Sequence, residues 1–211
     1  MTVAVYQFAD RTGQRRHSDR IASLSSAVTQ GADAYLIQAL QTAGNGTWFR
    51  VVERGSLDNL LKERQIIRQM RELYEGSNAR PIAPLLFAGI IIDGGIIGYD
   101  TNIITGGAGA RAFGIGASTE YRTDLVTINL RAVSVNTGEV LISVTTTKRI
   151  HSYMDRLGAL KFIDAGTVSL EGEIGTSVND SINLAIQLGI QAAVREMIEE
   201  GVRRSLWDYQ N

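Results

Sequence analysis

The chain has 211 residues, of which 44% are hydrophobic and 20% are charged, and its formal net charge is −1 at pH 7. These values predict one globular domain with insertions and argue against the strongly basic surface of a general nucleic-acid-binding protein. The sequence contains no cysteine, which excludes disulfides, thiolate metal sites, a cysteine nucleophile and a lipidated cysteine within these residues.

The first half of the chain alternates short strands with amphipathic helices. A strand is predicted over Val3 to Phe8, followed by a helix from Val28 to Ala43 that packs on a sheet and ends at Gly44-Asn45-Gly46. Thr47 to Glu53 is predicted as the next strand. A second helix begins at Ser56, a favourable N-cap residue, and carries an apolar stripe made of Leu57, Leu60, Leu61, Ile67, Met70 and Tyr74.

The second half reads as a sheet closed by a long helix. Leu85 to Tyr99 is rich in β-forming residues, and Val133 to Val144 is predicted to form a tight, central hairpin through Asn136-Thr137-Gly138. The last helix is predicted to begin near Asp180 or Ser181 and to cover the sheet.

Four further stretches alternate apolar and polar residues while carrying glycines and charges. They are Thr101 to Ala112, Thr123 to Ala132, Lys148 to Leu157 and Phe162 to Thr176. A period of two places alternate residues on opposite faces of a strand. We interpret the stretches as two membrane-crossing β-hairpins with an apolar face toward lipid, although a half-buried soluble sheet has the same alternation.

The second and fourth stretches show the pattern best. In the second, Val126, Ile128, Leu130 and Ala132 form the apolar face, which is the face expected to meet lipid. The polar residues, expected to line water inside a barrel, are Thr127, Asn129, Arg131, Ser169, Glu171 and Glu173.

Up to Ala132 the apolar residues of this stretch stand at even positions, and after it they stand at Val133 and Val135. A β-bulge at this point could turn the side chains to the other face as the strand passes into a soluble sheet. Four strands cannot close a barrel in lipid, because the smallest membrane barrels have about eight and an unpaired edge is not tolerated there. Several copies must therefore assemble into a ring.

Several segments in the same order along the chain resemble the CsgG family, the outer-membrane secretion channels of the curli amyloid system. The resemblance rests on the following segments: Val52 to Arg54, Leu57 to Arg68, Gly95 to Asn102, Gly106 to Ala117, Thr137 to Glu139, Phe162 to Asp164, Leu170 to Gly175 and Leu206 to Asn211.

The resemblance implies an α/β fold, a periplasmic α/β sandwich with two inserted transmembrane β-hairpins that form a shared oligomeric barrel. The soluble domain would comprise residues 1–99, 133–147 and 177–211, and the hairpins residues 100–132 and 148–176. Nine copies are typical of the family, which gives 36 strands, the number in the largest known barrel.

The same resemblance implies a passive pore rather than an enzyme, without a cofactor. Its expected partners are further copies of the chain, unfolded curlin substrates, periplasmic and surface curli accessory proteins and the lipid bilayer of the bacterial outer membrane, but not nucleic acid. Family members mature as lipoproteins, so the missing signal peptide and N-terminal cysteine indicate a truncated or recombinant form. The alternative is a soluble periplasmic α/β interaction domain without channel activity.

In the family, the loop before the first helix narrows the channel with a tyrosine, an asparagine and a phenylalanine. Here Leu24 falls at the phenylalanine position, Ser23 at the asparagine position, and Ser18 or Asp19 at the tyrosine position. With Arg15, Arg16 and Arg20, these residues are the candidates for a charged and apolar constriction ring.

Other motifs have simpler explanations. Gly107 to Ala112 fits a dinucleotide-binding loop but lacks the following helix and acidic residue. His17 and His151 are the only histidines and lie far apart, which makes a metal site or a catalytic triad improbable. Glu171 and Glu173 could be paired catalytic acids but suit a lumen lining equally well, and the arginines near Arg15 lack the interleaved aromatics of a nucleic-acid site.

Overall fold

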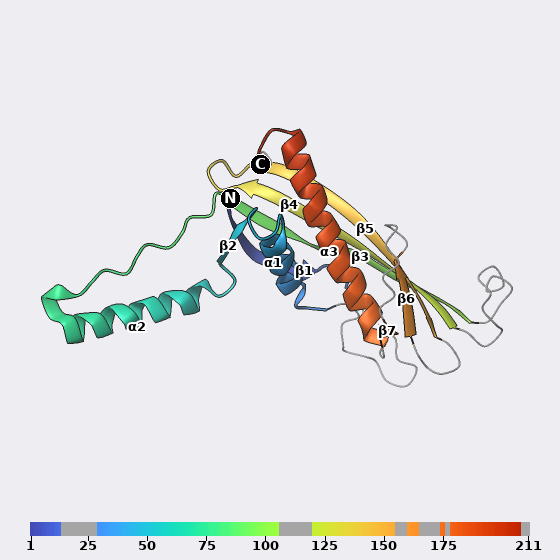
Figure 1. Cartoon of the computed structure of the whole chain (residues 1–211), viewed down its shortest axis with the longest axis horizontal. Helices are drawn as coiled ribbons and strands as arrows, with labels where there is room; N and C mark the ends of the chain where they lie inside the picture. The colour runs from blue at the N-terminus through green and yellow to red at the C-terminus, as the bar shows by residue number, and fades with distance from the viewer. Residues whose placement is uncertain (14–28, 106–119, 155–159, 165–173, 176–177, 208–211) are drawn as a thin grey trace.

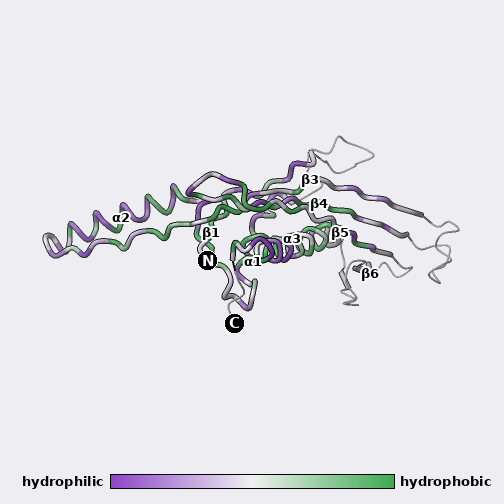
Figure 2. Tube along the Cα trace, turned by 90° about the horizontal axis from the view of Figure 1, so that it is seen from above, coloured by the Kyte–Doolittle hydropathy of each residue, from purple (hydrophilic) through white to green (hydrophobic). Residues whose placement is uncertain are grey.

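The computed structural model describes residues 1–13, 29–105, 120–154, 160–164, 174–175 and 178–207. A seven-stranded sheet in the order β2-β1-β3-β4-β5-β6-β7 carries two helices, α1 and α3, on one face (Figures 1 and 2). The third helix, α2, leaves this body as a separate arm. The layers confirm the predicted α/β class, and no helix among the described residues is long and apolar enough to cross a bilayer.

The N-terminal half supplies the parallel part of the sheet. Its elements are β1 (Thr2–Asp10), α1 (Ala32–Thr42), β2 (Arg50–Glu53), α2 (Leu57–Glu75) and the short 3-10 helix η1 (Gly76–Asn78). Strand β1 pairs in parallel with both β2 and β3.

The C-terminal half supplies the antiparallel part. Its elements are β3 (Ile90–Thr105), β4 (Glu120–Ser134), β5 (Val140–Met154), β6 (Leu160–Asp164), β7 (Ile174–Gly175) and α3 (Val178–Arg203). From β3 to β7, each strand pairs antiparallel with the next one along the chain.

The predicted stop of the first helix is confirmed by the backbone. Gly44, Asn45 and Gly46 follow α1 with φ values of 58°, 54° and 79°. Glycine adopts this left-handed region without steric cost, and asparagine tolerates it better than most residues. The chain can therefore turn sharply from α1 into β2.

The main core lies between the sheet and the two covering helices. From α1, Leu36 and Leu40 are fully buried, and from α3, Ile186 and Ile190 are at most 1% exposed. These side chains belong to one continuous apolar cluster with the helix-facing residues of β1, β3, β4 and β5. Each buried aliphatic side chain contributes about 1.5–3 kcal/mol relative to an exposed one.

The apolar face of β4 corrects one sequence interpretation. Val126, Ile128, Leu130 and Ala132 are at most 1% exposed and pack in the core that α3 covers. The interpretation of these four side chains as lipid-facing is wrong, because a helix about 50 residues further along the chain supplies the apolar cover. Periodicity within β4 could not distinguish that cover from lipid.

The predicted central hairpin is confirmed. Gly138 has a φ of 71°, and its N–H donates to the carbonyl of Ser134 at 2.9 Å. A register irregularity lies where the phase change predicted a bulge, since Ala132 pairs with Ile142 whereas Val133 pairs with Val140. It lies next to the residues of β4 that pack in the core under α3.

Two helix starts differ in detail from the expectation. Helix α3 begins at Val178, so that Asp180 and Ser181 fall within its first turn. Ser56 is the N-cap of α2 but makes no side-chain capping bond, and its own N–H donates to Glu53 Oε1 at 2.7 Å.

The three long strands β3, β4 and β5 extend past the helices as an antiparallel ribbon (Figure 1). The pairing of β3 with β4 runs from Ile90 opposite Ser134 to Thr105 opposite Glu120. The pairing of β4 with β5 reaches Glu120 opposite Met154. The hairpin boundaries 100–132 and 148–176 stay predictions.

Candidate functional site

One face of the sheet carries many polar side chains and is covered by none of the described helices. Three of the predicted pore-lining residues, Thr127, Asn129 and Arg131, lie on this face of β4, opposite the buried row. The Thr127 hydroxyl lies 3.2 Å from that of Thr147 on β5. The three residues thus share one surface, and their role as pore lining stays a prediction.

Asn129 is held most firmly of the three. Its side-chain amide nitrogen lies within hydrogen-bonding distance of three groups on β5: the Ser143 hydroxyl at 3.3 Å, the Val144 carbonyl at 3.0 Å and the Thr145 hydroxyl at 3.1 Å. An amide nitrogen has two protons to donate, so these contacts share them. They fix the polar face of β4 against β5.

The same face carries a charged group drawn from three elements. Arg131 on β4 donates to Asp93 on β3, and Arg11, just after β1, lies 3.9 Å from the other oxygen of that carboxylate. The Arg11, Asp93 and Arg131 side chains are 54%, 28% and 38% exposed. At this exposure, ion pairs contribute about 0–1 kcal/mol each, so the group orients side chains more than it stabilises the fold.

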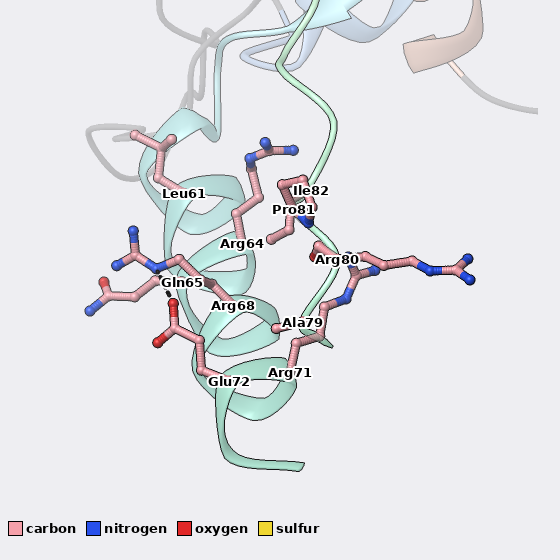
Figure 3. A pocket seen from close by; sticks show the side chains of 10 residues that line it. All are labelled: Leu61, Arg64, Gln65, Arg68, Arg71, Glu72, Ala79, Arg80, Pro81 and Ile82. Atoms are coloured by element: carbon pink, nitrogen blue, oxygen red, sulfur yellow. Dashed lines mark hydrogen bonds and ion pairs between the residues drawn. The ribbon is translucent and has the colours of Figure 1, made fainter. Parts of the chain in front are cut away.

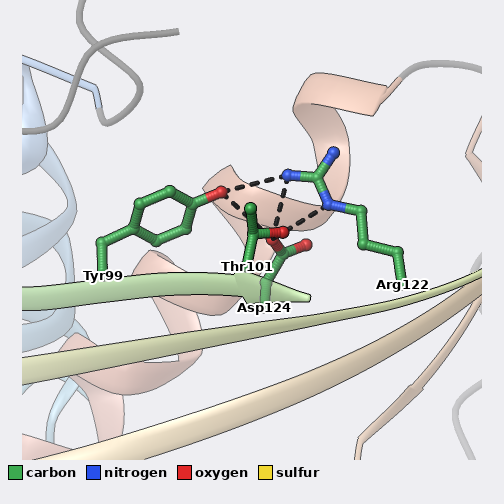
Figure 4. Close-up of polar contacts among 4 residues, drawn as sticks. All are labelled: Tyr99, Thr101, Arg122 and Asp124. Carbon is green, nitrogen blue, oxygen red and sulfur yellow. Dashed lines mark hydrogen bonds and ion pairs between the residues drawn. The ribbon is translucent and has the colours of Figure 1, made fainter. Parts of the chain in front are cut away.

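A buried polar cluster lies on the helix-facing side of β3 and β4, at the end of the buried row of β4 (Figure 4). Asp124 on β4 is fully buried and accepts hydrogen bonds on one oxygen from Tyr99 at 3.1 Å, Thr101 at 2.8 Å and Arg122 Nε at 3.0 Å. Arg122 also donates to the Tyr99 hydroxyl at 3.0 Å. Charge pairing and hydrogen bonds together offset the cost of burying a carboxylate.

The environment of this cluster favours a protonated tyrosine. Burial and the nearby negative charge of Asp124 raise the pKa of Tyr99 above its usual value. The phenol therefore stays a donor to Asp124 through the physiological pH range. The cluster joins β3 to β4 at the base of the ribbon.

Sequence reasoning missed this cluster, although a signal was present. Asp124 continues the even-numbered row of β4 in which Val126, Ile128 and Leu130 are buried. A carboxylate in phase with a buried apolar row must find a partner. The partners could not be named, because Tyr99 and Thr101 lie more than 20 residues earlier in the sequence.

The second unusual surface is the arm, defined here as α2, η1 and the return segment 79–89. Helix α2 has no buried residue, and Figures 1 and 2 show the arm leaving the body on the side opposite the far ends of β3, β4 and β5. Three arginines tie the helix side to the return segment through its carbonyl oxygens. These bonds run from Arg54 to Leu86 at 2.8 Å, Arg64 to Ala83 at 2.6 Å and Arg71 to Arg80 at 2.9 Å.

Of the apolar stripe predicted for α2, Leu61, Ile67, Met70 and Tyr74 are exposed, whereas Leu57 and Leu60 are half-buried. Leu73 and Tyr74 are 73% and 77% exposed, and Phe87 in the return segment is 89% exposed. The other exposed apolar residues of the arm are Leu61, Ile66, Ile67, Met70 and Leu86. Contiguous apolar surface of this kind marks an interaction site in soluble proteins.

The remaining candidates do not form a site in the described residues. The constriction candidates from Arg15 to Leu24, the pore-lining candidates Ser169, Glu171 and Glu173, His17, and the glycine motif from Gly107 to Ala112 lie outside them. The His151 ring lies 3.1 Å from the Thr123 hydroxyl, and no group of three metal-ligating side chains occurs in the described part of the chain.

Comparison with known proteins identifies close relatives. The family described as "Curli production assembly/transport component CsgG" matches residues 1–211. The protein of that name from Salmonella typhimurium is 44% identical over 211 residues, covering 99% of this chain and 74% of that protein. The one from Escherichia coli is 43% identical over the same length and coverage.

Similar solved structures are more distant. The PelC dodecamer of Paraburkholderia phytofirmans has 12% identity and a TM-score of 0.37, covering 92% of this chain and 85% of that one. A hypothetical protein from Chlamydia trachomatis has 9% identity and a TM-score of 0.37, covering 92% and 94%. At these scores, nothing about their assembly transfers to this chain.

Proposed function

The chain belongs to the CsgG family of curli production assembly/transport components, and from that membership we propose that it is the subunit of an outer-membrane pore that exports unfolded curli subunits. Transport through this pore is passive, and the α/β body lies in the periplasm. The whole-chain family match is the observation that carries the proposal.

The shape of the sheet supports a barrel built from several copies. Strands β3, β4 and β5 are 16, 15 and 15 residues long, whereas a strand needs about 9–11 residues to cross a bilayer. Their inner parts are already covered by helices, and the remaining part of β4, Glu120 to Leu125, is shorter than one crossing, so the proposed membrane portion also includes predicted hairpin residues outside the described strands. Nine copies that contribute four strands each form the 36-stranded barrel expected from the family.

The arm supports self-association. An isolated helix of fewer than about 12–15 residues is marginal in water, and longer ones still draw most of their stability from packing of an apolar face. Helix α2 has 19 residues and none of them is buried within its own subunit. We assign the stripe that contains Ile66, Met70 and Leu73 to contact with a neighbouring copy in the ring.

The pore narrows at the loop before α1 in this proposal. Arg15, Arg16, Ser18, Asp19, Arg20, Ser23 and Leu24 are the constriction candidates. The polar residues Thr127, Asn129, Arg131, Ser169, Glu171 and Glu173 face the water-filled interior. Nine-fold repetition places each lumen-facing residue in a ring of nine identical side chains, so one substitution changes all nine side chains of that ring.

The proposed partners are the molecules that the subunit would contact while unfolded curli subunits cross the outer membrane. They are unfolded curlin subunits, the periplasmic and surface curli accessory proteins, and the lipid of the outer membrane.

Conductance in a planar lipid bilayer tests the pore. The purified oligomer should conduct ions, and Leu24→Ala or Arg20→Ala should change its single-channel current, because either residue would alter the narrowest ring. Arg195→Ala on the exposed side of α3 is the control and should leave the current unchanged. A ring-forming preparation without conductance would favour the alternative of a soluble periplasmic interaction domain.

A further inference from the structure

A groove of about 660 Å³ runs between α2 and the start of the return segment (Figure 3). Four arginines are among its described lining residues, and Glu72 is the one acidic residue among them. The arginines are Arg64, Arg68, Arg71 and Arg80. The groove is therefore strongly cationic, although the whole chain is close to neutral.

The arginines remain able to bind an anion. Arg64 and Arg71 each donate one guanidinium N–H to a backbone carbonyl oxygen, at 2.6 Å and 2.9 Å. A carbonyl carries no net charge, so these bonds hold each guanidinium in place without neutralising it. A guanidinium has five N–H donors, which leaves enough for a bidentate carboxylate pair.

The internal ion pair in the groove is weak. Arg68 Nε lies 3.8 Å from Glu72 Oε1, and both side chains are more than 60% exposed. Exposed pairs of this type contribute about 0.3–0.5 kcal/mol. A carboxylate from another molecule can therefore replace Glu72 at little cost.

The arginines of the groove and one part of the exposed apolar surface lie on opposite faces of α2, although Leu61 lines the groove. Helical spacing places Arg64, Arg68 and Arg71 on one side, whereas Ile66, Met70 and Leu73 fall on the other. Packing of the face that carries Ile66, Met70 and Leu73 against a neighbouring copy thus leaves the groove open.

The spacing of the arginines selects the form of the ligand. Arg64 to Arg71 spans about 10 Å along the helix, at about 1.5 Å per residue. An extended peptide places alternate side chains about 6.6 Å apart on one face. Two carboxylates at alternate positions of an extended chain therefore match the rise of about 6 Å from Arg64 to Arg68.

The position of the groove excludes lipid. The arm and the far end of the β3–β5 ribbon point in opposite directions (Figure 1). If the ribbon enters the membrane, the groove lies on the aqueous side and far from the headgroups. Nucleic acid is disfavoured because the described lining residues of the groove include no aromatic side chain on which a base could stack.

We propose that this groove captures an extended, carboxylate-rich segment of the exported polypeptide before the polypeptide enters the pore. The inference rests on the proposed function for the identity of the ligand, while the groove itself is independent of it. Because the assembly repeats the groove around its aqueous mouth, weak single contacts act together on one unfolded chain.

Peptide binding to the purified 211-residue chain tests the groove. The probe is a fluorescent ten-residue peptide of glycine and serine with aspartate at alternate positions, and its match has asparagine at those positions. The aspartate peptide should bind at least about tenfold more tightly, which corresponds to about 1.4 kcal/mol, and its affinity should fall with added salt.

A matched pair of variants locates the binding. The triple variant R64Q/R68Q/R71Q should weaken binding of the aspartate peptide at least about tenfold. The control R50Q/K62Q/R195Q removes the same charge elsewhere, including Lys62 on the opposite side of α2, and should stay within about twofold. An equal loss of peptide affinity in both variants would show that binding depends only on the net charge of the protein, and would overturn the groove as the binding site.

Two further binding measurements test the type of contact and the class of ligand. The variant R64K/R68K/R71K keeps the charge but lacks the planar fork, so intermediate binding is expected even if the glutamine variant folds poorly. Full binding in the lysine variant would overturn bidentate recognition. A single-stranded oligonucleotide of equal charge that bound as tightly as the peptide would overturn the choice of a polypeptide ligand.

Capture events in a planar bilayer identify the source of the segment. An unfolded polypeptide with an aspartate-rich segment, added on the arm side, should block the current less often in R64Q/R68Q/R71Q than in the control. Lost peptide binding with unchanged capture would show that the groove serves another partner and overturn the cargo assignment. Peptide binding without any conductance would overturn the pore and leave the groove standing.

Discussion

The α/β body and the arm place amphipathic helices in opposite situations. In the body, α1 and α3 bury their apolar faces against the sheet, and Leu36, Ile186 and Ile190 are at most 1% exposed. On the arm, Leu73 of α2 is 73% exposed. The difference shows that an apolar stripe on a helix predicts a surface that becomes covered, but not which element or molecule covers it. A stripe left open by its own subunit belongs to an assembly.

The largest expected effect contrasts two carboxylates, one from each region. Asp124→Ala should destabilise the body by about 3–5 kcal/mol, because it leaves Arg122 and the Tyr99 hydroxyl without their acceptor at a site excluded from water. Glu72→Ala on the arm should cost less than about 0.5 kcal/mol, since its pair with Arg68 is exposed. Urea unfolding followed by circular dichroism measures both. Similar costs would show that the Asp124 cluster does not stabilise the base of the ribbon.

A smaller contrast compares two leucines. Leu36→Ala should cost about 3 kcal/mol, from lost apolar contact and the cavity left in the core. Leu73→Ala should change the stability of the isolated subunit by less than about 0.5 kcal/mol. The unfolding midpoint of each variant under monomeric conditions checks the pair, and a large loss at Leu73 would place α2 within the core of its own subunit.

The smallest effect on the fold should accompany a clear effect on assembly. Leu73→Ser with Tyr74→Ser should leave the unfolding midpoint of the subunit nearly unchanged but weaken self-association at least about tenfold, because it removes two exposed apolar side chains. Sedimentation velocity across a concentration series measures this. The control is Asp58→Ser with Lys62→Ser, which changes two exposed polar residues of the same helix. Unchanged assembly of the Leu73 and Tyr74 variant would remove this stripe from the interface.

Much of the fold could be predicted because its signals are local. The turn after α1 depends on Gly44, Asn45 and Gly46 themselves, and the β4–β5 hairpin depends on Gly138. The phase change after Ala132 also predicted the site of a register irregularity. Each of these features follows from backbone conformations available to a few neighbouring residues.

The site was predicted less completely because it depends on distant residues. The sequence pointed to Thr127, Asn129 and Arg131 as one polar face, and the structure brings them together on the open side of the sheet. The cluster at Asp124 escaped prediction because strand register, which no single segment specifies, brings Tyr99 and Thr101 to it.

The order of strands and helices, the alternation along β4 and the membership in a family were determined by the sequence alone, because they depend on short-range spacing and residue identity. The tertiary structure decided what each apolar face meets: α3 for Val126 to Ala132, and open solvent for the stripe of α2. Periodicity defines a face but not its cover, since a helix, a lipid and another subunit all satisfy the same hydrophobic requirement.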